Sequence, residues 1–129
     1  MGSIKQVIII KASPKEVYDA FMDSKKYSLF TGDKAIISKK IGGKFSAFGG
    51  WASGENLELI EGKKIVQSWR ASDWKEGHYS RIIINLEKVD NGTKIIFEHE
   101  GVPDKWREDI EKGWNEYYWK PLKKMLEKD

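Results

Sequence analysis

Residues 79–101 read Y-S-R-I-I-I-N-L-E-K-V-D-N-G-T-K-I-I-F-E-H-E-G, and this stretch decides how the chain folds. Tyr79–Val89 and Thr93–Gly101 carry apolar side chains at alternate positions, a pattern typical of β-strands with one buried face. Asn91-Gly92 lies between them, and an Asn-Gly pair supplies the positive φ angles that tight hairpin turns need. The stretch therefore predicts an antiparallel hairpin.

The register of this hairpin decides which residues face the core. A two-residue loop at Asn91-Gly92 puts the apolar sets of both strands on one face, pairing Leu86 with Phe97 and Ile84 with His99. A three-residue loop would put them on opposite faces, which burial opposes. We therefore expect His99 to point inward, as a core imidazole with a backbone partner, as the polar group of a cavity, or as a catalytic base.

Five further strands are predicted upstream of the hairpin: Ile4–Lys11, Ile36–Lys40, Lys44–Phe48, Ala52–Ile60 and Lys64–Ala71. The turns between neighbouring strands are too short for parallel crossovers, so we expect an antiparallel sheet. Ser13-Pro14-Lys15-Glu16 follows the first strand and predicts a helix start with a capping box. A second short helix is expected over Ser24–Leu29.

The last part of the chain predicts one long helix that begins at Val102-Pro103-Asp104 and runs toward Lys128. Pro121 lacks an N–H and should kink this helix. Gly113 costs about 1 kcal/mol of helix propensity, so we expect a close contact there. Apolar residues recur at helical spacing along one side: Trp106, Ile110, Trp114, Tyr117 or Tyr118, Pro121 or Leu122, and Met125.

These elements predict an α+β fold in which a seven-stranded curved antiparallel sheet wraps the long C-terminal helix, with two short helices after the first strand. A long helix with a broad apolar stripe needs a concave partner, and the sheet supplies it. At 129 residues the chain is expected to form one domain over residues 1–129.

Composition excludes several classes of protein. The chain has no cysteine, so it has no disulfide, thiolate metal site or cysteine nucleophile. It shows no signal peptide and no run of ~18 apolar residues, so we expect a cytoplasmic location and no membrane contact. The basic residues are 20 Lys and 3 Arg among 20 acidic residues. Nucleic-acid readers favour Arg, so no nucleic-acid partner is expected.

No motif for catalysis, metal binding or cofactor binding is present. The chain lacks a G-x-G-x-x-G after a strand, a phosphate loop, H-E-x-x-H and an EF-hand, and no Ser or Asp is spaced to complete a triad. His78 is expected roughly 20 Å along the strands from His99, too far to share a metal ion. We predict no catalytic residue, no metal and no cofactor. Trp51 and Trp74 fall at turns, where each either covers an end of the core or forms an exposed recognition site.

Six segments, taken in order, resemble one known family. They are I-G-G-K-F-S-A-F at 41–48, S-G-E-N-L-E-L at 53–59, K-K-I-V-Q-S-W-R at 63–70, W-K-E-G-H-Y-S at 74–80, G-V-P at 101–103 and G-W-N-E-Y-Y at 113–118. Over essentially the whole chain they are similar to the C-terminal domain of the activator of the ninety-kilodalton heat-shock chaperone ATPase, a stress-response protein, and to its stand-alone relatives.

The resemblance implies the START-like, birch-pollen-allergen-like helix-grip fold, with a hydrophobic cavity between sheet and helix. It also implies contact with the heat-shock chaperone. The separate N-terminal domain of the full co-chaperone is not found in this sequence, so the resemblance alone does not imply activation of the ATPase by this chain.

Three functions follow as hypotheses. The first is a non-catalytic binding module for a small hydrophobic or amphipathic ligand, whose cavity is lined by Phe21, Phe45, Trp69, Ile84, Phe97, His99, Trp114 and Tyr118. The second is a co-chaperone-like module that contacts the chaperone through its Lys-rich surface and the rings near Trp51 and Trp74. The third is a cyclase-type or hydratase-type enzyme that uses His99.

Overall fold

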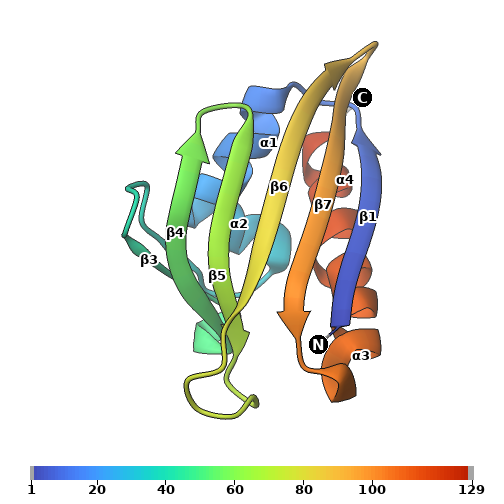
Figure 1. The fold of residues 1–129 in the computed structure, drawn as a ribbon. Coiled ribbons are helices and arrows are strands. Elements are labelled where there is room, and N and C mark those ends of the chain that lie inside the picture. Colours follow the sequence, from blue (N-terminus) through green and yellow to red (C-terminus); the bar gives the residue numbers. More distant parts are fainter. Residues whose placement is uncertain (1, 128–129) are drawn as a thin grey trace.

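The computed structural model describes residues 2–127, whose seven strands form one curved sheet in the order β1-β7-β6-β5-β4-β3-β2 (Figure 1). Neighbouring strands are antiparallel throughout, as predicted. The strands are β1 (Gly2–Ile10), β2 (Ile36–Ile37), β3 (Lys44–Ala47), β4 (Ala52–Ile60), β5 (Lys64–Ala71), β6 (Ser80–Val89) and β7 (Gly92–Val102). The helices lie together on one face of this sheet, so the predicted α+β fold is confirmed.

Two short helices follow β1, as the sequence indicated. Helix α1 (Pro14–Met22) starts with the predicted capping box, in which Ser13 and Glu16 each bond the other's backbone N–H. Helix α2 (Ser24–Thr31) ends at Gly32, whose φ of 74° closes the last turn.

The β6–β7 hairpin keeps the predicted faces but not the predicted pairing. Its two turn residues are Asp90-Asn91, and Ile84 pairs with Phe97 while Ile82 pairs with His99. The expected pairing of Ile84 with His99 is therefore wrong by two residues. A slip of two leaves every side chain on its face, so His99 still points inward.

The pairing differs from the prediction because Gly92 lies in strand β7 and not in the turn. Asn91 takes the positive φ of the turn, at 69°, which asparagine tolerates. Gly92 instead belongs to β7, where a Cβ would lie 2.1 Å from the carbonyl oxygen of Ile10. The glycine is needed because the end of strand β1 approaches it closely, and not for the turn.

The C-terminal segment is helical but not one continuous α-helix. A 3₁₀ turn, η2, precedes it, and a π-helical stretch, η3, separates two α-helices. The pieces are η2 (Asp104–Trp106), α3 (Arg107–Gly113), η3 (Trp114–Trp119) and α4 (Lys120–Leu126). The predicted end toward Lys128 lies outside the described residues.

The widened turn of η3 ends two residues before Pro121, where the sequence predicts a kink. In η3 the N–H of Lys120 bonds the carbonyl of Asn115, five residues back instead of four. This spacing turns both Trp114 and Trp119 toward the sheet, and each is only 2% exposed. The predicted apolar stripe omitted Trp119, because it assumed 3.6 residues per turn throughout.

The same segment lies along β1. Trp119 donates its indole N–H to the side-chain oxygen of Gln6 at 2.7 Å, and the Gln6 amide donates to the carbonyl of Glu111 at 3.2 Å. One side chain of the strand thus ties two pieces of the C-terminal segment to the edge of the sheet.

Candidate functional site

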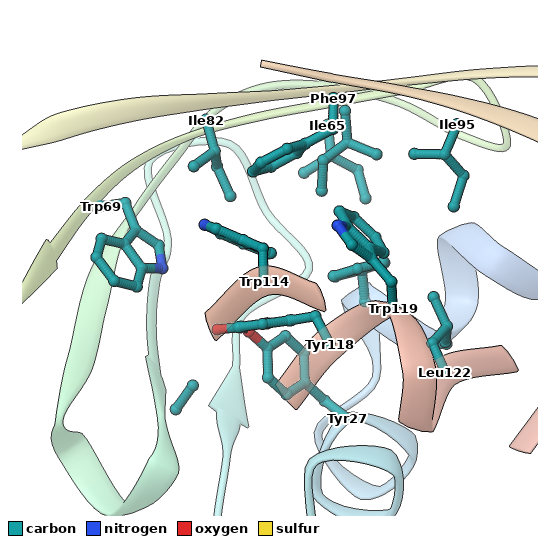
Figure 2. Packing of buried hydrophobic residues seen from close by; sticks show 14 of the residues in the cluster. Tyr27, Ile65, Trp69, Ile82, Ile95, Phe97, Trp114, Tyr118, Trp119 and Leu122 are labelled. Carbon is teal, nitrogen blue, oxygen red and sulfur yellow. Dashed lines mark hydrogen bonds between the residues drawn. The ribbon is translucent and has the colours of Figure 1, made fainter. Parts of the chain in front are cut away.

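The space between the sheet and the C-terminal segment is filled with side chains (Figure 2). The ring centroid of Phe97 lies 4.4 Å from that of Trp114, which lies 3.9 Å from that of Tyr118. Ile65 and Leu122 are fully buried in the same layer. The hollow expected at the centre of the fold is therefore occupied by the protein's own core.

An apolar pocket lies instead at one end of this core. It has a volume of about 340 Å³, at the lower end of the range typical of small-molecule sites. The 3₁₀ turn η1 (Phe48–Gly50), strand β5 and the C-terminal segment enclose it. Its walls are Phe48, Trp51, Trp69, Trp106, Asp109, Ile110, Gly113, Trp114, Tyr117 and Tyr118.

The eight predicted ligand-binding residues are all buried, but they do not share one cavity. Trp69, Trp114 and Tyr118 line the pocket. The other five pack within the core away from its walls: Phe21, Phe45, Ile84, Phe97 and His99.

The mouth of the pocket carries exposed rings. Tyr117 is 62% exposed and Trp51 is 37% exposed. The ring of Phe48 packs edge-on against both, with centroids 6.3 Å from each. The indole N–H of Trp51 donates to the carboxylate of Asp73 at 2.8 Å, which fixes the orientation of this ring.

Sequence reasoning missed several of these wall residues. Phe48 adopts a φ of 54° and is followed by Gly49 and Gly50, both also at positive φ. Phe48 was predicted as the last residue of the strand Lys44–Phe48, although a ring beside two glycines was a usable signal. Gly113 and Tyr117 are four residues apart on one side of the helical segment, a second stripe beside the core stripe.

The pocket also corrects the reason given for Gly113. A Cβ at this position would meet only the Cδ2 atom of Tyr117, at the ordinary contact distance of 3.8 Å. The expected close contact is therefore wrong, and the missing side chain leaves part of the pocket open.

Trp69 supplies a polar group beside the pocket. Its side chain is buried, and its indole Nε1 makes no hydrogen bond of standard length and angle in the described structure, although it lies near enough to the Tyr118 hydroxyl to oppose the rise in the pKa of that group. Figure 2 shows this nitrogen on the side of the ring that faces the Tyr118 hydroxyl, without a bond between them. A buried N–H without an acceptor costs about 1–3 kcal/mol. An acceptor supplied by a bound molecule would recover that free energy.

Two tyrosine hydroxyls lie behind this group. Tyr27 of α2 donates its hydroxyl to that of Tyr118 at 2.9 Å, deep in the core. Burial raises the pKa of Tyr118, and burial together with the neighbouring Tyr118 raises the pKa of Tyr27. Both hydroxyls therefore stay neutral and act as hydrogen-bonding groups, not as acid–base groups.

Trp51 and Trp74, the two tryptophans predicted at turns, differ in how far they are buried. Trp74 is 4% exposed and packs against Trp69 at 5.4 Å between centroids, so it covers the end of the core. Its Nε1 is also buried and unpaired, but Trp74 is not a wall of the apolar pocket. Trp51 remains partly exposed at the mouth.

His99 belongs to a buried chain of hydrogen bonds. Trp114 donates its indole N–H to Nδ1 of His99 at 3.1 Å, and Nε2 of His99 lies 2.7 Å from the hydroxyl of Ser80. Ser80 in turn donates to the carbonyl of Trp69 at 2.8 Å. Because Nδ1 accepts, the neutral ring carries its proton on Nε2 and donates it to Ser80. Both nitrogens are satisfied, so His99 is a core imidazole held mainly by side chains.

This arrangement does not activate a nucleophile. The sequence showed no serine spaced to serve His99, yet the fold brings Ser80 into contact with it. In a catalytic pair the histidine accepts the serine proton, whereas here it donates to the serine oxygen. Burial also lowers the pKa of His99 to about 3. The hydrogen-bond partners of the His99 ring among residues 2–127 are Ser80 and Trp114, so no carboxylate of this part of the chain holds the ring in the opposite tautomer.

His78 lies nearer to His99 than the predicted separation along the strands, because it contacts Gly101, two residues from His99. His78 Nε2 is 2.9 Å from the carbonyl oxygen of Gly101, and its ring packs against Trp74. Within residues 2–127, no group of three or more His, Cys, Asp or Glu side chains could hold a metal ion. In the same part of the chain, no helix is long and apolar enough to cross a membrane.

Comparison with known proteins agrees with the resemblance seen in the sequence. The family model "Activator of Hsp90 ATPase homolog 1-like protein" matches residues 11–127. The human "Activator of 90 kDa heat shock protein ATPase homolog 1" is 33% identical over 114 residues, covering 88% of this chain and 34% of the relative. The homologue from Dictyostelium discoideum is 36% identical over 106 residues, covering 81% and 27%. The chain thus spans about a third of the length of such relatives.

One solved structure has the same fold as this chain over nearly the whole length of both. The crystal structure of an HSP90 activator from Plasmodium falciparum superposes with a TM-score of 0.90 at 28% identity, covering 97% of this chain and 96% of the other. This likeness supports the predicted helix-grip architecture. The names of these relatives describe activators of another protein's ATPase, in agreement with the prediction that this chain is not an enzyme.

Proposed function

Because this chain belongs to the family of Activator of Hsp90 ATPase homolog 1-like proteins, we propose that it is a co-chaperone-like module that binds a ninety-kilodalton heat-shock chaperone. The observation that carries the proposal is the family match over residues 11–127, which takes in every helix and every strand except β1. The curated relatives are about three times as long as the matched part. Binding is therefore the part of their activity that we propose here.

We assign the contact to an aromatic rim, defined as Phe48, Trp51, Trp106 and Tyr117. Trp and Tyr are enriched among the residues that dominate binding energy in protein interfaces. Tyr117 and Trp51 expose their rings at the pocket mouth, where a partner can cover them. Trp74, which the sequence placed in the same surface, is buried and is left out of the rim.

The test is binding of the purified chaperone to the wild-type chain and to two tyrosine variants, measured by calorimetry. Tyr117→Ala removes a ring from the rim and should weaken binding about tenfold or more. Tyr79→Ala is the matched control, because Tyr79 is 55% exposed and lies outside the pocket walls. It should change the affinity less than twofold. Stimulation of the chaperone ATPase is the second readout.

Two outcomes contradict different parts of the proposal. Absence of a complex even at low salt would overturn the chaperone-binding function. Equal effects of Tyr117→Ala and Tyr79→Ala would leave that function in place but remove its assignment to the rim. Since the basic residues are 20 Lys and 3 Arg, we expect salt to weaken the complex through screening without abolishing an apolar contact.

A second candidate function is the binding of a small apolar molecule, which the pocket of about 340 Å³ favours. Its walls are mostly aromatic, as in many small-molecule sites. The variant Gly113→Leu tests it, because a leucine there would project into the pocket. Loss of binding of an apolar probe in this variant supports the candidate, and unchanged binding contradicts it.

A further inference from the structure

We infer that the pocket selects neutral, mainly apolar molecules that carry a hydrogen-bond acceptor, and that the indole N–H of Trp69 donates to this acceptor. The inference rests on the second candidate function, small-molecule binding, and names the chemistry of its ligand. A ketone or amide between two apolar groups is the class of molecule that fits.

The first argument is the unpaired donor. Trp69 is 2% exposed and lines the pocket, yet its Nε1 makes no hydrogen bond of standard length and angle, even with the nearby Tyr118 hydroxyl. Buried N–H groups are nearly always paired, so an orphan beside a pocket indicates where an acceptor would bind. The other polar groups of this region are already used: His99 and Ser80 bond each other, and Tyr27 bonds Tyr118.

The second argument is the charge of the walls. Asp109 is the one charged residue among them, and it is exposed toward solvent. An anionic ligand would be repelled by this carboxylate and would lose its hydration against aromatic walls. The donor at Trp69 favours an acceptor, so a deeply bound cation is also disfavoured. A neutral carbonyl satisfies both conditions.

The third argument is the shape of the walls. The rings of Trp51 and Trp114 pack on Trp69 with centroids 5.8 Å and 6.2 Å away, so aromatic faces and edges surround the donor. Such walls suit flat apolar groups. The pocket volume of about 340 Å³ limits the ligand to a small molecule.

The test uses two probes with the same skeleton, benzophenone and diphenylmethane, which differ by a carbonyl in place of a methylene. Protein with ¹⁵N-labelled tryptophan gives one indole N–H resonance for each of the six Trp residues, and Trp69→Phe assigns that of Trp69. Benzophenone should bind about three- to tenfold more tightly than diphenylmethane, the range of one neutral hydrogen bond. It should also move the Trp69 N–H resonance downfield.

Variants separate the donor from the pocket. Trp69→Phe keeps a ring but removes the N–H, and should bring both probes to similar affinities. Gly113→Leu should weaken both probes together. Lys112→Leu is its matched control, because Lys112 is exposed on the neighbouring position and is not a pocket wall. It should leave both affinities unchanged.

The outcomes are distinguishable. If neither probe binds the wild-type chain, small-molecule binding itself fails. If both bind equally and the Trp69 resonance does not move, the pocket binds apolar molecules but the inferred hydrogen bond is wrong. The resonance is measured on the wild-type chain, so the hydrogen bond is tested even if Trp69→Phe does not fold.

Discussion

His99 is the residue whose surroundings most constrain its chemistry. Its Nδ1 accepts from Trp114, its Nε2 donates to Ser80, and its ring is fully buried. The chain of donors runs in one direction and ends on the carbonyl of Trp69. A proton added to Nδ1 would face the indole N–H of Trp114, donor against donor. The fold therefore holds His99 neutral.

This neutrality predicts how stability depends on pH. Burial lowers the folded-state pKa of His99 from 6.5 to about 3, so below pH 6.5 the unfolded chain binds a proton that the folded chain does not. The free energy of unfolding should fall as pH drops from 6.5 toward 3, by up to about 5 kcal/mol from this group. Urea unfolding at pH 7.5, 6, 5 and 4 measures the slope.

Two glutamine variants separate this contribution from those of other groups. His99→Gln removes the titrating ring and should flatten the slope below pH 6.5. His78→Gln changes the other histidine and should leave the slope in place. An equal slope in wild-type and His99→Gln proteins would show that acid destabilisation arises elsewhere.

At the scale of the elements, the π-helical stretch η3 decides which rings enter the core. Its five-residue spacing brings in Trp114 and Trp119 together, with their centroids 5.6 Å apart. With α-helical spacing, two residues five apart differ by about 140° around the axis and could not both face the sheet. Tyr117 remains 62% exposed on the same stretch.

Alanine variants on η3 test this geometry. Trp119→Ala removes a buried ring and the hydrogen bond to Gln6, and should lower the free energy of unfolding by about 3–5 kcal/mol. Tyr117→Ala removes an exposed ring and should change it by about 0.5 kcal/mol or less. Chemical unfolding of both variants gives the comparison. Similar losses would show that Trp119 is not turned inward as described.

Two glycines in regular elements should respond in opposite ways to alanine. Gly92→Ala places a Cβ against the Ile10 carbonyl and should destabilise the fold by about 1–3 kcal/mol. Gly113→Ala has room for its Cβ at a helical φ of −60°, and should stabilise it by about 0.5–1 kcal/mol. Thermal unfolding of the pair checks both signs, and a stabilising Gly92→Ala would contradict the close approach at β7.

The elements themselves could be predicted because their signals are local. The capping box of α1 and the bounds of β4 and β5 came directly from the sequence, since side-chain alternation and cap chemistry act over a few residues. The predicted hairpin pairing was wrong because the position of Gly92 is set by its close approach to Ile10, which is 82 residues away in sequence. Periodicity cannot detect a contact at that separation.

The site was predictable only in part, because its position also depends on contacts between residues that are far apart in the sequence. Trp69, Trp114 and Tyr118 were named because they lie on core stripes, and they line the pocket. The position of the pocket depends on how completely side chains fill the centre, and packing is a property of the assembled core. The π-helical turn that brings Trp119 inward has no simple sequence signature, and it helps to close the expected central hollow.

At the scale of the whole molecule, one hydrophobic core joins the sheet, α1, α2 and the C-terminal segment. We therefore expect residues 1–129 to unfold as a single cooperative unit. Tryptophan fluorescence and far-ultraviolet circular dichroism should give coincident urea transitions. Two separated transitions would contradict the single-domain prediction.

The two edge strands of the sheet determine how readily the molecule could pair with another chain and aggregate. A free strand edge is a template on which a neighbouring chain can add its own backbone and begin to aggregate. Here one border, β2, is only two residues long, and along the other the C-terminal segment is fastened to β1 through Gln6 (Figure 1). The border at β2 therefore gives a neighbouring chain only two residues on which to pair, and the nine-residue border β1 is the edge at which such pairing would begin.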